Sequence, residues 1–515
     1  MAIGTYFGRM RFAAAAMVVA FCGLSIAPPA LAATPEKGGT LNISFPGSPR
    51  LLDPAITGSL EEWVVTSWLY NNLTRMNSNY EIEPDLAESW DASEGGKVWT
   101  FKLRQGVKFQ SGSEMTAEDV VFSINRVLDP EVKSRGRGAI GPIEKIEALD
   151  KYTVQFTLSR PIAEFPANMT LPYVRIIRKD TDVKLDTASD GTGPFILKEY
   201  VVGDRVVVTK NPDYFREDEP HVDEVRVQVY PDATAEINAL KAGQTDIMWQ
   251  VRPDQVSLLE GDSSIKVEEI PSGSFVTVVM RSDEPPFDNP LVRQALKLSV
   301  DRDTIVKAAL QGHGTIANDQ SLPPNSPLFN DEVAPAKRDI AKAKDLLKEA
   351  GYPDGLDLTL YTSDARVGML PLALMTQQMA RDAGFNIKLQ TVTWDVFLNQ
   401  IWEKKNFYVQ NWFARPTNDS RISPYFLSRD KGGSLNDYYY SNSELDEILL
   451  QAQGELDEEK RKNLYHEAQR IISEDGPGII PFFKNNVSAY QTNVEGFSVD
   501  PGINLPAEKI WLKKD

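Results

Sequence analysis

The sequence has very few cysteine and histidine residues, which form the disulfide bonds of small secreted proteins and bind transition metals. Among its 515 residues there is one cysteine, Cys22, and there are three histidines, His221, His313 and His466. A disulfide framework needs pairs of cysteines, and a zinc-type site needs a cluster of cysteine and histidine ligands that this chain mostly lacks. We therefore expect no disulfide and no metal or other cofactor.

Catalytic sequence motifs are also missing. The chain contains no H-E-x-x-H helix motif, no G-x-S-x-G nucleophile elbow and no phosphate-binding P-loop spacing. The histidines are far apart in sequence, and neighbouring acids such as Asp446 and Glu447 are better explained as the solvated face of a helix. We therefore predict that the protein is not an enzyme.

An apolar run long enough to cross a membrane is absent as well. The run from Phe12 to Ile26 is shorter than the roughly 20 residues that a spanning helix requires. It follows Arg9 and Arg11 and precedes the small-residue site Ala30-Leu31-Ala32, an order typical of a cleavable secretory signal peptide. We expect residues 1–32 to be removed and the mature protein to reside in a Gram-negative type of periplasm.

Acidic residues outnumber basic ones, and the formal net charge is −18. Strong acidity argues against nucleic acid and anionic lipid as partners and favours solubility. The composition, 42% hydrophobic and 25% charged, is that of an ordinary soluble protein, and the length exceeds what one hydrophobic core usually holds. We expect two or three domains and a monomer. The global charge does not fix the local field of a binding site.

Strand and helix patterns alternate along most of the chain. Thr116 is a good N-cap with acids directly behind it, so a helix is expected from there to about Val127. Period-two patterns predict strands at 39–45, 98–103, 153–158, 205–209, 224–229, 275–280, 356–362, 386–391 and 479–483. Further helices are predicted at 233–242, 290–300, 302–311, 338–350, 370–383, 443–455 and 457–474. This order predicts two α/β lobes, with a boundary near residue 272 and a return crossing near residue 484.

Seven short blocks carry a family resemblance. In chain order they are EPDLAESW (83–90), WTFKLRQGVKF (99–109), MTAEDVVFS (115–123), GTGPF (191–195), NPDYF (211–215), VRQAL (292–296) and LLKEAGY (346–352). Together they resemble the peptide/nickel class, family 5, of extracytoplasmic solute-binding proteins of ABC importers, such as the dipeptide- and oligopeptide-binding proteins. The blocks occur in order across nearly all of the mature chain. They identify the scaffold and leave the solute open.

The resemblance implies an α/β, two-lobed periplasmic-binding-protein fold with a hinge between the lobes and an extra subdomain in the first lobe. Lobe I would comprise residues 33–272 and 484–515, with the inserted subdomain around 60–185, and lobe II would comprise residues 273–483. The resemblance also implies a receptor that captures a small polar solute, expected to be a peptide. That receptor would deliver the solute to an inner-membrane permease with its ATPase subunits. Alternatives are an opine, a glutathione-like compound or a metal chelate and, from another class, a secreted hydrolase.

Two arginines are the first candidates for the solute site. Arg366 falls where the resemblance implies a clamp for a peptide carboxylate, and a guanidinium suits such a group; a surface arginine before a helix is the alternative. Three residues after Trp412, in NWFARPTND, Arg415 stands where peptide-binding relatives usually carry an aspartate for the α-ammonium. Asp419 could take that ammonium instead, or could pair with Arg415 inside the protein. Two arginines in the cleft would favour a ligand with two anionic groups.

Polar and aromatic residues supply the remaining candidates. Thr57 and Ser59 offer hydroxyl groups, and Trp394 and Trp412 offer flat apolar faces, although aromatic residues are at least as often part of a core. Asn436 precedes Tyr438-Tyr439-Tyr440, of which one or two could face the site. The predicted ligand-binding residues are therefore Thr57, Ser59, Arg366, Trp394, Trp412, Arg415, Asp419 and Asn436.

Overall fold

The computed structural model describes residues 1, 34–78, 80–181, 183–500, 502 and 504–514. The chain divides into two units, residues 1–35 and 36–515, and every helix and strand named below belongs to the second unit. The predicted signal peptide, apart from Met1, and Cys22 within it lie outside the described residues. Among the helices that the structure describes, none is both long and apolar enough to cross a membrane.

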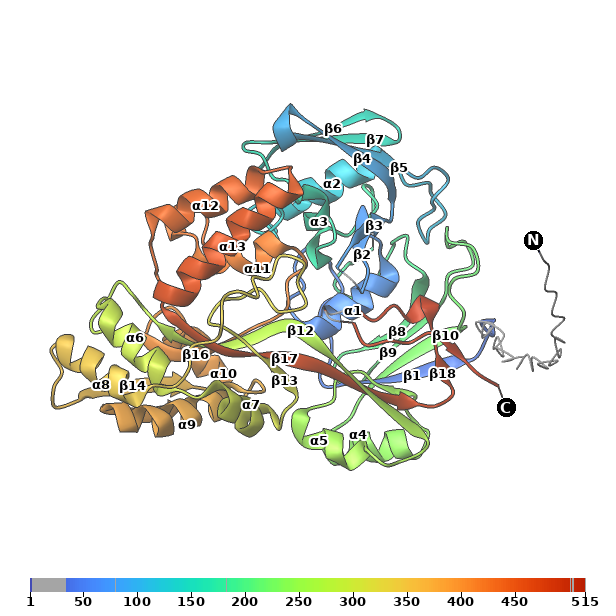
Figure 1. Ribbon diagram of the computed structural model, residues 1–515. Coiled ribbons are helices and arrows are strands. Elements are labelled where there is room, and N and C mark those ends of the chain that lie inside the picture. The colour runs from blue at the N-terminus through green and yellow to red at the C-terminus, as the bar shows by residue number, and fades with distance from the viewer. Residues whose placement is uncertain (2–33, 79, 182, 501, 503, 515) are drawn as a thin grey trace. The chain divides into compact units, whose positions relative to one another are not determined.

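One large mixed sheet runs through the second unit (Figure 1). It contains β1 (Thr40–Phe45), β8 (Phe195–Val201), β9 (Arg205–Lys210), β10 (Glu224–Val229), β11 (Ile247–Met248), β12 (Ile265–Met280), β13 (Gly314–Ile316), β14 (Leu356–Thr362), β15 (Phe385–Thr391), β16 (Phe407–Trp412) and β17 (Gly478–Gln491). The spatial order is β15-β14-β16-β12-β17-β11-β1-β10-β9-β8, and β13 pairs with β17 beside this path. The strands predicted for this region are confirmed, although β12 and β17 extend well beyond the patterns at 275–280 and 479–483.

The two longest strands, β12 and β17, pair antiparallel at the centre of the sheet. They have 16 and 14 residues, and their pairing starts with Ile265 opposite Gln491 and extends to Val279 opposite Gly478. The boundaries predicted near residues 272 and 484 both fall inside this pair. The two predicted lobes would therefore share one sheet and be joined by two strands, and the division into lobes stays a prediction.

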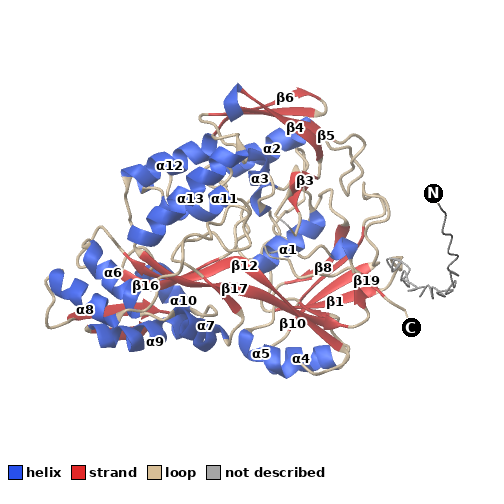
Figure 2. Cartoon of the chain, viewed as in Figure 1, coloured by secondary structure: helices blue, strands red, loops and turns tan. Residues whose placement is uncertain are grey.

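Helices cover both ends of the large sheet (Figure 2). In the described residues they are α1 (Leu60–Leu69), α2 (Ala117–Leu128), α3 (Phe165–Asn168), α4 (Ala233–Lys241), α5 (Pro253–Leu259), α6 (Pro290–Ser299), α7 (Arg302–Leu310), α8 (Ile340–Glu349), α9 (Met369–Ala380), α10 (Trp394–Val396), α11 (Asn418–Phe426), α12 (Ser443–Gly454) and α13 (Glu458–Asp475). At one end α4 contacts β11 and α5 contacts β12, whereas at the other α9 packs on β14, β15 and β16. Each end has its own buried apolar core.

A separate four-stranded sheet lies within the range predicted for the inserted subdomain. Its strands β4 (Ala87–Ser93), β5 (Val98–Leu103), β6 (Ile143–Asp150) and β7 (Thr153–Leu158) pair in the order β4-β5-β7-β6. Helix α2 contacts β6 and β7, and the helix start predicted at Thr116 is confirmed by a capping box with Asp119. A third buried core fills this part. Two small hairpin-like pairs complete the fold: β2 (Thr74–Met76) with β3 (Ile82–Pro84), and β18 (Val494–Glu495) with β19 (Trp511–Leu512).

The sequence patterns do not predict three elements: α1, which lines the candidate site, and β16 and α11, which flank a loop that lines it. Helix α1 buries residues around most of its circumference, so it shows little amphipathic periodicity. Strand β16 is buried along its whole length and therefore lacks alternation. Helix α11 contains Pro424, a residue that normally ends a helix, and its sequence begins directly after a turn-like stretch.

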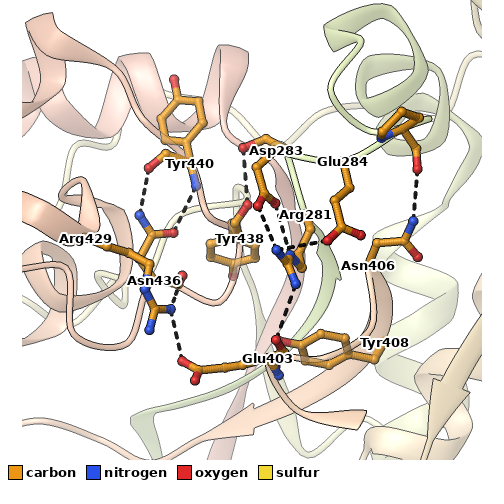
Figure 3. Close-up of polar contacts among 12 residues, drawn as sticks. Arg281, Asp283, Glu284, Glu403, Asn406, Tyr408, Arg429, Asn436, Tyr438 and Tyr440 are labelled. Carbon is orange, nitrogen blue, oxygen red and sulfur yellow. Dashed lines mark hydrogen bonds and ion pairs between the residues drawn. The ribbon is translucent and has the colours of Figure 1, made fainter.

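A polar network holds the segment after α11 against the end of β12 (Figure 3). Arg281 donates hydrogen bonds to Asp283 at 2.7 and 3.0 Å, and Arg429 donates to Glu403 at 3.0 Å. The ring of Tyr439 lies between these guanidinium groups, with its centroid 3.8 Å and 4.5 Å from their Cζ atoms. Both contacts are of cation–π type and fix this tyrosine in place.

Beside this network lies a buried carboxyl group, that of Asp437. This residue is fully buried, and its Oδ1 accepts a hydrogen bond from Trp402 Nε1 at 2.9 Å. Its Oδ2 has no hydrogen-bond partner among the described residues. Burial raises the pKa of Asp437 to about 8; the Trp402 hydrogen bond opposes this shift and the nearby charge of Glu403 adds to it.

Replacing Asp437 by asparagine should change how the free energy of unfolding depends on pH. The native pKa of about 8 lies above the ordinary value of 3.8, so the native state loses stability as pH rises between these values. The asparagine amide would still accept from Trp402 but cannot ionise. Asp437→Asn should therefore gain stability relative to the wild type, by up to about 1.4 kcal/mol for each pH unit. Urea unfolding from pH 5 to 8 measures the difference, with Asp430→Asn, at an exposed acid nearby, as control. Parallel profiles for the wild type and Asp437→Asn would contradict the raised pKa.

Candidate functional site

Two adjoining cavities open between distant segments of the described chain. The larger, here named the Arg366 cavity, has a volume of about 470 Å³, and the smaller, here named the Arg415 cavity, has a volume of about 270 Å³. Both are lined by Asp500, Gly502 and Asn504, so they meet at this C-terminal loop. Other residues lining the Arg366 cavity include Ser59, Glu61, Ser274, His313, Phe413 and Lys484.

Arg366 lines the wall of its cavity and packs against two aromatic side chains. It follows β14, and its Cζ atom is 4.9 Å from the ring centroid of Trp394 and 6.0 Å from that of Phe413. The Trp394 ring is itself stacked on Phe397, with centroids 5.2 Å apart. More than a third of Arg366 stays accessible, and it forms no ion pair with an acid of the described chain. Partial loss of hydration lowers its pKa, and the charge of Glu61 acts in the opposite direction.

A second cation, Lys484, lines the same cavity from β17. Its Nζ donates to Asn411 Oδ1 at 2.5 Å, and no carboxylate of the described residues pairs with it. Burial, reinforced by the positive charge of Arg366, lowers the pKa of Lys484 to about 8. The Arg366 cavity therefore holds two cationic groups that lack an acidic partner, which is an arrangement suited to an anion.

Arg415 lines the smaller cavity from the loop between β16 and α11. Its electrostatic neighbours are the phenols of Tyr425 and Tyr173, and it does not form the internal pair with Asp419 that the sequence leaves open. The loop itself is held by Arg421, which donates from Nε to the Arg415 carbonyl at 2.7 Å. Arg415 is thus presented to the cavity by a loop whose backbone is fixed.

Asp419 lies in the first turn of α11 and lines neither cavity. Its carboxylate accepts hydrogen bonds from the Ser423 hydroxyl, from Gln453 Nε2 at 3.2 Å and from the Tyr465 hydroxyl at 3.3 Å. Its backbone N–H donates to Glu164 at 3.1 Å. Burial raises the pKa of Asp419 to about 6, and the charge of Glu164 adds to this effect. The side chain is therefore committed to contacts with α12 and α13.

Some of the serine, threonine and tryptophan residues predicted to bind ligand line a cavity, whereas others are buried in the protein core. Ser59 lines the Arg366 cavity and is also the N-cap of α1, where it forms a capping box with Glu62. Thr57 is fully buried, and its hydroxyl donates to the Pro54 carbonyl at 3.0 Å. Trp412 is 8% exposed and packs on Trp402 and Tyr425. The ring of Trp394 packs against the guanidinium group of Arg366.

Asn436 lies outside both cavities and organises its own loop (Figure 3). It is fully buried, and its Nδ2 donates to the carbonyls of Leu427 at 2.7 Å and Tyr440 at 2.8 Å. Its Oδ1 accepts from the Tyr440 N–H at 3.2 Å. Tyr438 is also buried, and its hydroxyl contacts Thr277 at 2.9 Å. Each polar atom of the Asn436 amide thus has a backbone partner.

Several cavity residues are absent from the sequence-based prediction. Lys484 is a single basic residue in an apolar strand, and Asp500 is an ordinary acid in a turn-rich segment, so neither carries a local signal. His313 lies 2.7 Å, through Nδ1, from Glu269 Oε2. Within the part of the chain that the structure describes, no group of three or more His, Cys, Asp or Glu side chains is arranged to hold a metal ion.

Comparison with known proteins places this chain in a family. Residues 81–434 match the model for the middle region of bacterial extracellular solute-binding proteins, family 5. The chain is 29% identical to di/tripeptide-binding protein 1 of Pseudomonas aeruginosa (strain UCBPP-PA14), over 92% of this chain and 95% of that protein. It is also 29% identical to the glutathione-binding protein GsiB of Escherichia coli (strain K12), over 90% and 92% of the two chains.

A solved structure extends the comparison to the fold. The PBP AgaA from A. tumefaciens R10, in complex with agropinic acid, superposes with a TM-score of 0.81 at 26% identity, over 93% of this chain and 99% of that chain. The α/β fold class predicted from the sequence is thereby confirmed, and the family model, which covers more than half of the chain, confirms the resemblance. This protein belongs to the bacterial extracellular solute-binding proteins of family 5.

Proposed function

We propose that the protein is a periplasmic receptor of an ABC importer that captures a small peptide-like solute with at least one carboxylate. One observation carries the proposal: Arg366 and Lys484 line one cavity, and no acid of the described residues forms an ion pair with either of them. A carboxylate placed between them would supply the missing counter-charge. In a cleft shielded from water such a contact is strong and directional.

The size and walls of the Arg366 cavity support the same class of solute. A volume of about 470 Å³ lies within the range of ordinary small-molecule sites, which combine apolar walls with a few convergent polar groups. Phe413 supplies an apolar wall, and Ser59 and Asn485 supply polar groups. The names of the relatives point in the same direction, because peptides, glutathione and agropinic acid all carry carboxylates.

The proposed mechanism of solute capture depends on segments of both predicted lobes that line the same cavity. Ser59 and Asp500 belong to the predicted lobe I, whereas Arg366 and Phe413 belong to the predicted lobe II. A solute that contacts both sets gains more free energy when the lobes are closed than when they are apart, and this difference drives closure. The closed receptor would then dock on a membrane permease with its ATPase subunits. The signal-peptide pattern at residues 1–32 supports delivery to the periplasm.

The proposal is tested by identifying what co-purifies with the mature protein. Mass spectrometry of extracts from the wild type should detect a carboxylate-bearing peptide-like compound, and the Arg366→Gln preparation should contain at least about tenfold less of it. Arg470→Gln, at an exposed arginine of α13, is the matched control and should retain the compound. The identified compound should raise the melting temperature of the wild type without being chemically changed. Turnover of the compound, or equal retention by Arg366→Gln, would contradict a receptor of this kind.

Lys484 should make binding of the carboxylate depend on pH. Its pKa in the free protein is about 8, and an anion beside it favours the protonated form, so affinity should fall as pH rises from about 7 to about 9. The limiting slope is about tenfold in the dissociation constant for each pH unit above the pKa. Titration calorimetry with glutathione, for the wild type and Lys484→Gln, measures this effect. Because titration of the ligand is common to both proteins, the difference between the two profiles isolates Lys484, and identical profiles would show that Lys484 does not contact the anion.

A further inference from the structure

The acidic groups around the two cavities are unequal in their availability to a cationic ligand. Asp500 lines both cavities from the segment that follows β18. Its Oδ1 accepts from the backbone N–H of Gly502 at 2.8 Å and of Asn504 at 3.5 Å. Asn486 donates to the Asp500 carbonyl at 2.8 Å and so ties this loop to β17. The side-chain amide of Asn504 also stabilises the charged carboxylate.

The charge of Asp500 has no basic partner in contact with it. Its hydrogen-bond donors are neutral amides, and no basic side chain of the described residues forms an ion pair with it. The positive charge of Lys509, which lines the Arg415 cavity, acts on it without such a pair and favours its ionised form. Burial raises the pKa of Asp500 to about 6, so the group is still mostly ionised at neutral pH. A partly buried carboxylate that no cation contacts is a position that a ligand ammonium would stabilise.

The other acids that line the cavities are already engaged or more weakly charged. In the Arg415 cavity, Glu83 is paired with Arg75, and Asp85 is paired with Arg216. In the Arg366 cavity, Glu61 forms no ion pair with Arg366, but the positive charge of Arg366 acts on this position and would repel a ligand ammonium there. A further acid of the Arg415 cavity is Glu508, whose pKa is raised to about 7 by burial and then by the charge of Glu219. Such a carboxyl is a weaker partner for a cation at neutral pH.

Asp419 is the acid that the sequence suggests for a ligand ammonium, and its geometry makes it a poor partner for a ligand. Both of its carboxylate oxygens accept from side chains of α11, α12 or α13, and it lines neither cavity. A ligand ammonium would have to enter the helix packing and displace these donors. Asp500 needs no such displacement, because it already lies at the junction of the two cavities.

We propose that Asp500 receives the ammonium group of the bound solute. The ligand then has a carboxylate held by Arg366 and Lys484 in the larger cavity, an ammonium at Asp500 at the junction, and a second carboxylate at Arg415 in the smaller cavity. The chemical class is a short peptide with a free amine and a carboxylate at one end and another carboxylate at the other. Both γ-glutamyl peptides and peptides that start with glutamate have this pattern. The inference rests on the proposed function, because it requires a carboxylate-bearing solute in these cavities.

The constraint that makes this arrangement selective is charge pairing in a confined site. A free amine beside Asp500 forms a charge-assisted hydrogen bond, whereas N-acetylation removes the charge and leaves the aspartate without its partner. Breaking one side of such a pair typically costs a factor of about 30 to several thousand in affinity. The wild type should therefore bind the free-amine form of a ligand at least about 100-fold more tightly than its N-acetylated form.

Titration calorimetry on the mature protein tests this selectivity with four probes. They are γ-Glu-Ala and Glu-Ala, each with a free amine and with an acetylated amine. The wild type should prefer the free-amine form of at least one pair, and whichever pair shows the larger preference identifies the γ- or α-linked class. Asp500→Asn should weaken the free-amine probe at least about 100-fold and leave the acetylated probe within about threefold. Equal weakening of both probes would show that Asp500 only shapes the loop, and would overturn the proposal.

Two further variants keep the result interpretable. Asp500→Ser removes the charge but retains an oxygen that accepts from the Gly502 and Asn504 N–H groups, so it should lose the free-amine preference even if Asp500→Asn disturbs the loop. Asp262→Asn is the matched control, because Asp262 is a partly exposed aspartate that likewise accepts from a backbone N–H two residues on, that of Ser264, and lines neither cavity. It should retain the wild-type preference.

The remaining outcomes separate this inference from the proposed function. Loss of the free-amine preference in Glu508→Gln but not in Asp500→Asn would assign the ammonium to Glu508 and overturn the role of Asp500. Tight binding of acetylated and free-amine probes alike, with loss of both in Arg366→Gln, would overturn the role of Asp500 while the receptor function stands. Failure of all four probes, with a ligand in the mass spectra that lacks any carboxylate, would overturn both.

Discussion

The antiparallel pairing of β12 with β17 is the constraint on which the rest of the structure depends. The two strands connect the part that contains β1 and β10 with the part that contains β14 to β16, so every cavity residue is positioned relative to this ladder. The ladder shifts register between Pro271 and Ser274, opposite Lys484. At this bulge the Ser272 hydroxyl donates to the Lys484 carbonyl, and the Ser274 hydroxyl accepts from the Ala414 N–H. An irregularity in the central strands therefore fixes Lys484 on one side and the start of the Arg415 loop on the other.

The electrostatics of the cavities oppose those of the whole chain. The protein carries a formal charge of −18, yet its larger cavity presents Arg366 and Lys484 without paired acids in the described residues. Burial disfavours the charged form of both groups and lowers both pKa values, and the charge of Arg366 adds to the shift at Lys484. A carboxylate would relieve that unfavourable interaction on binding. A bound carboxylate would then contribute to the electrostatic balance of the cavity, and the global charge gives no indication of this.

The sequence predicts the scaffold far better than the site. Regular elements with clear periodicity, such as β5 and α2, appear where expected, and the ordered blocks identify the family. Arg366 and Arg415 line cavities, and both could be singled out because their surroundings match those of relatives. Thr57 and Asn436 look equally polar in the sequence, but their side chains are used by nearby backbone groups. Lys484 and Asp500 meet Arg366 only through the fold, and no local pattern encodes that convergence.

Arg415 stands where peptide-binding relatives usually carry an aspartate, and the structure of its loop explains how an arginine fits this position. One end of the loop is fixed where Ala414 donates to Ser274, and the other where Arg421 donates to the Arg415 carbonyl. Beyond the loop, Asp419 begins α11 with its N–H on Glu164 and its carboxylate directed toward α12 and α13. Shifting Asp419 into the cavity would break these contacts together. With the loop held at both ends, position 415 faces the cavity and position 419 does not, so an acid for a ligand ammonium has to come from another segment. Among the acids of the described residues, Asp500 on the C-terminal loop is the one that lines both cavities.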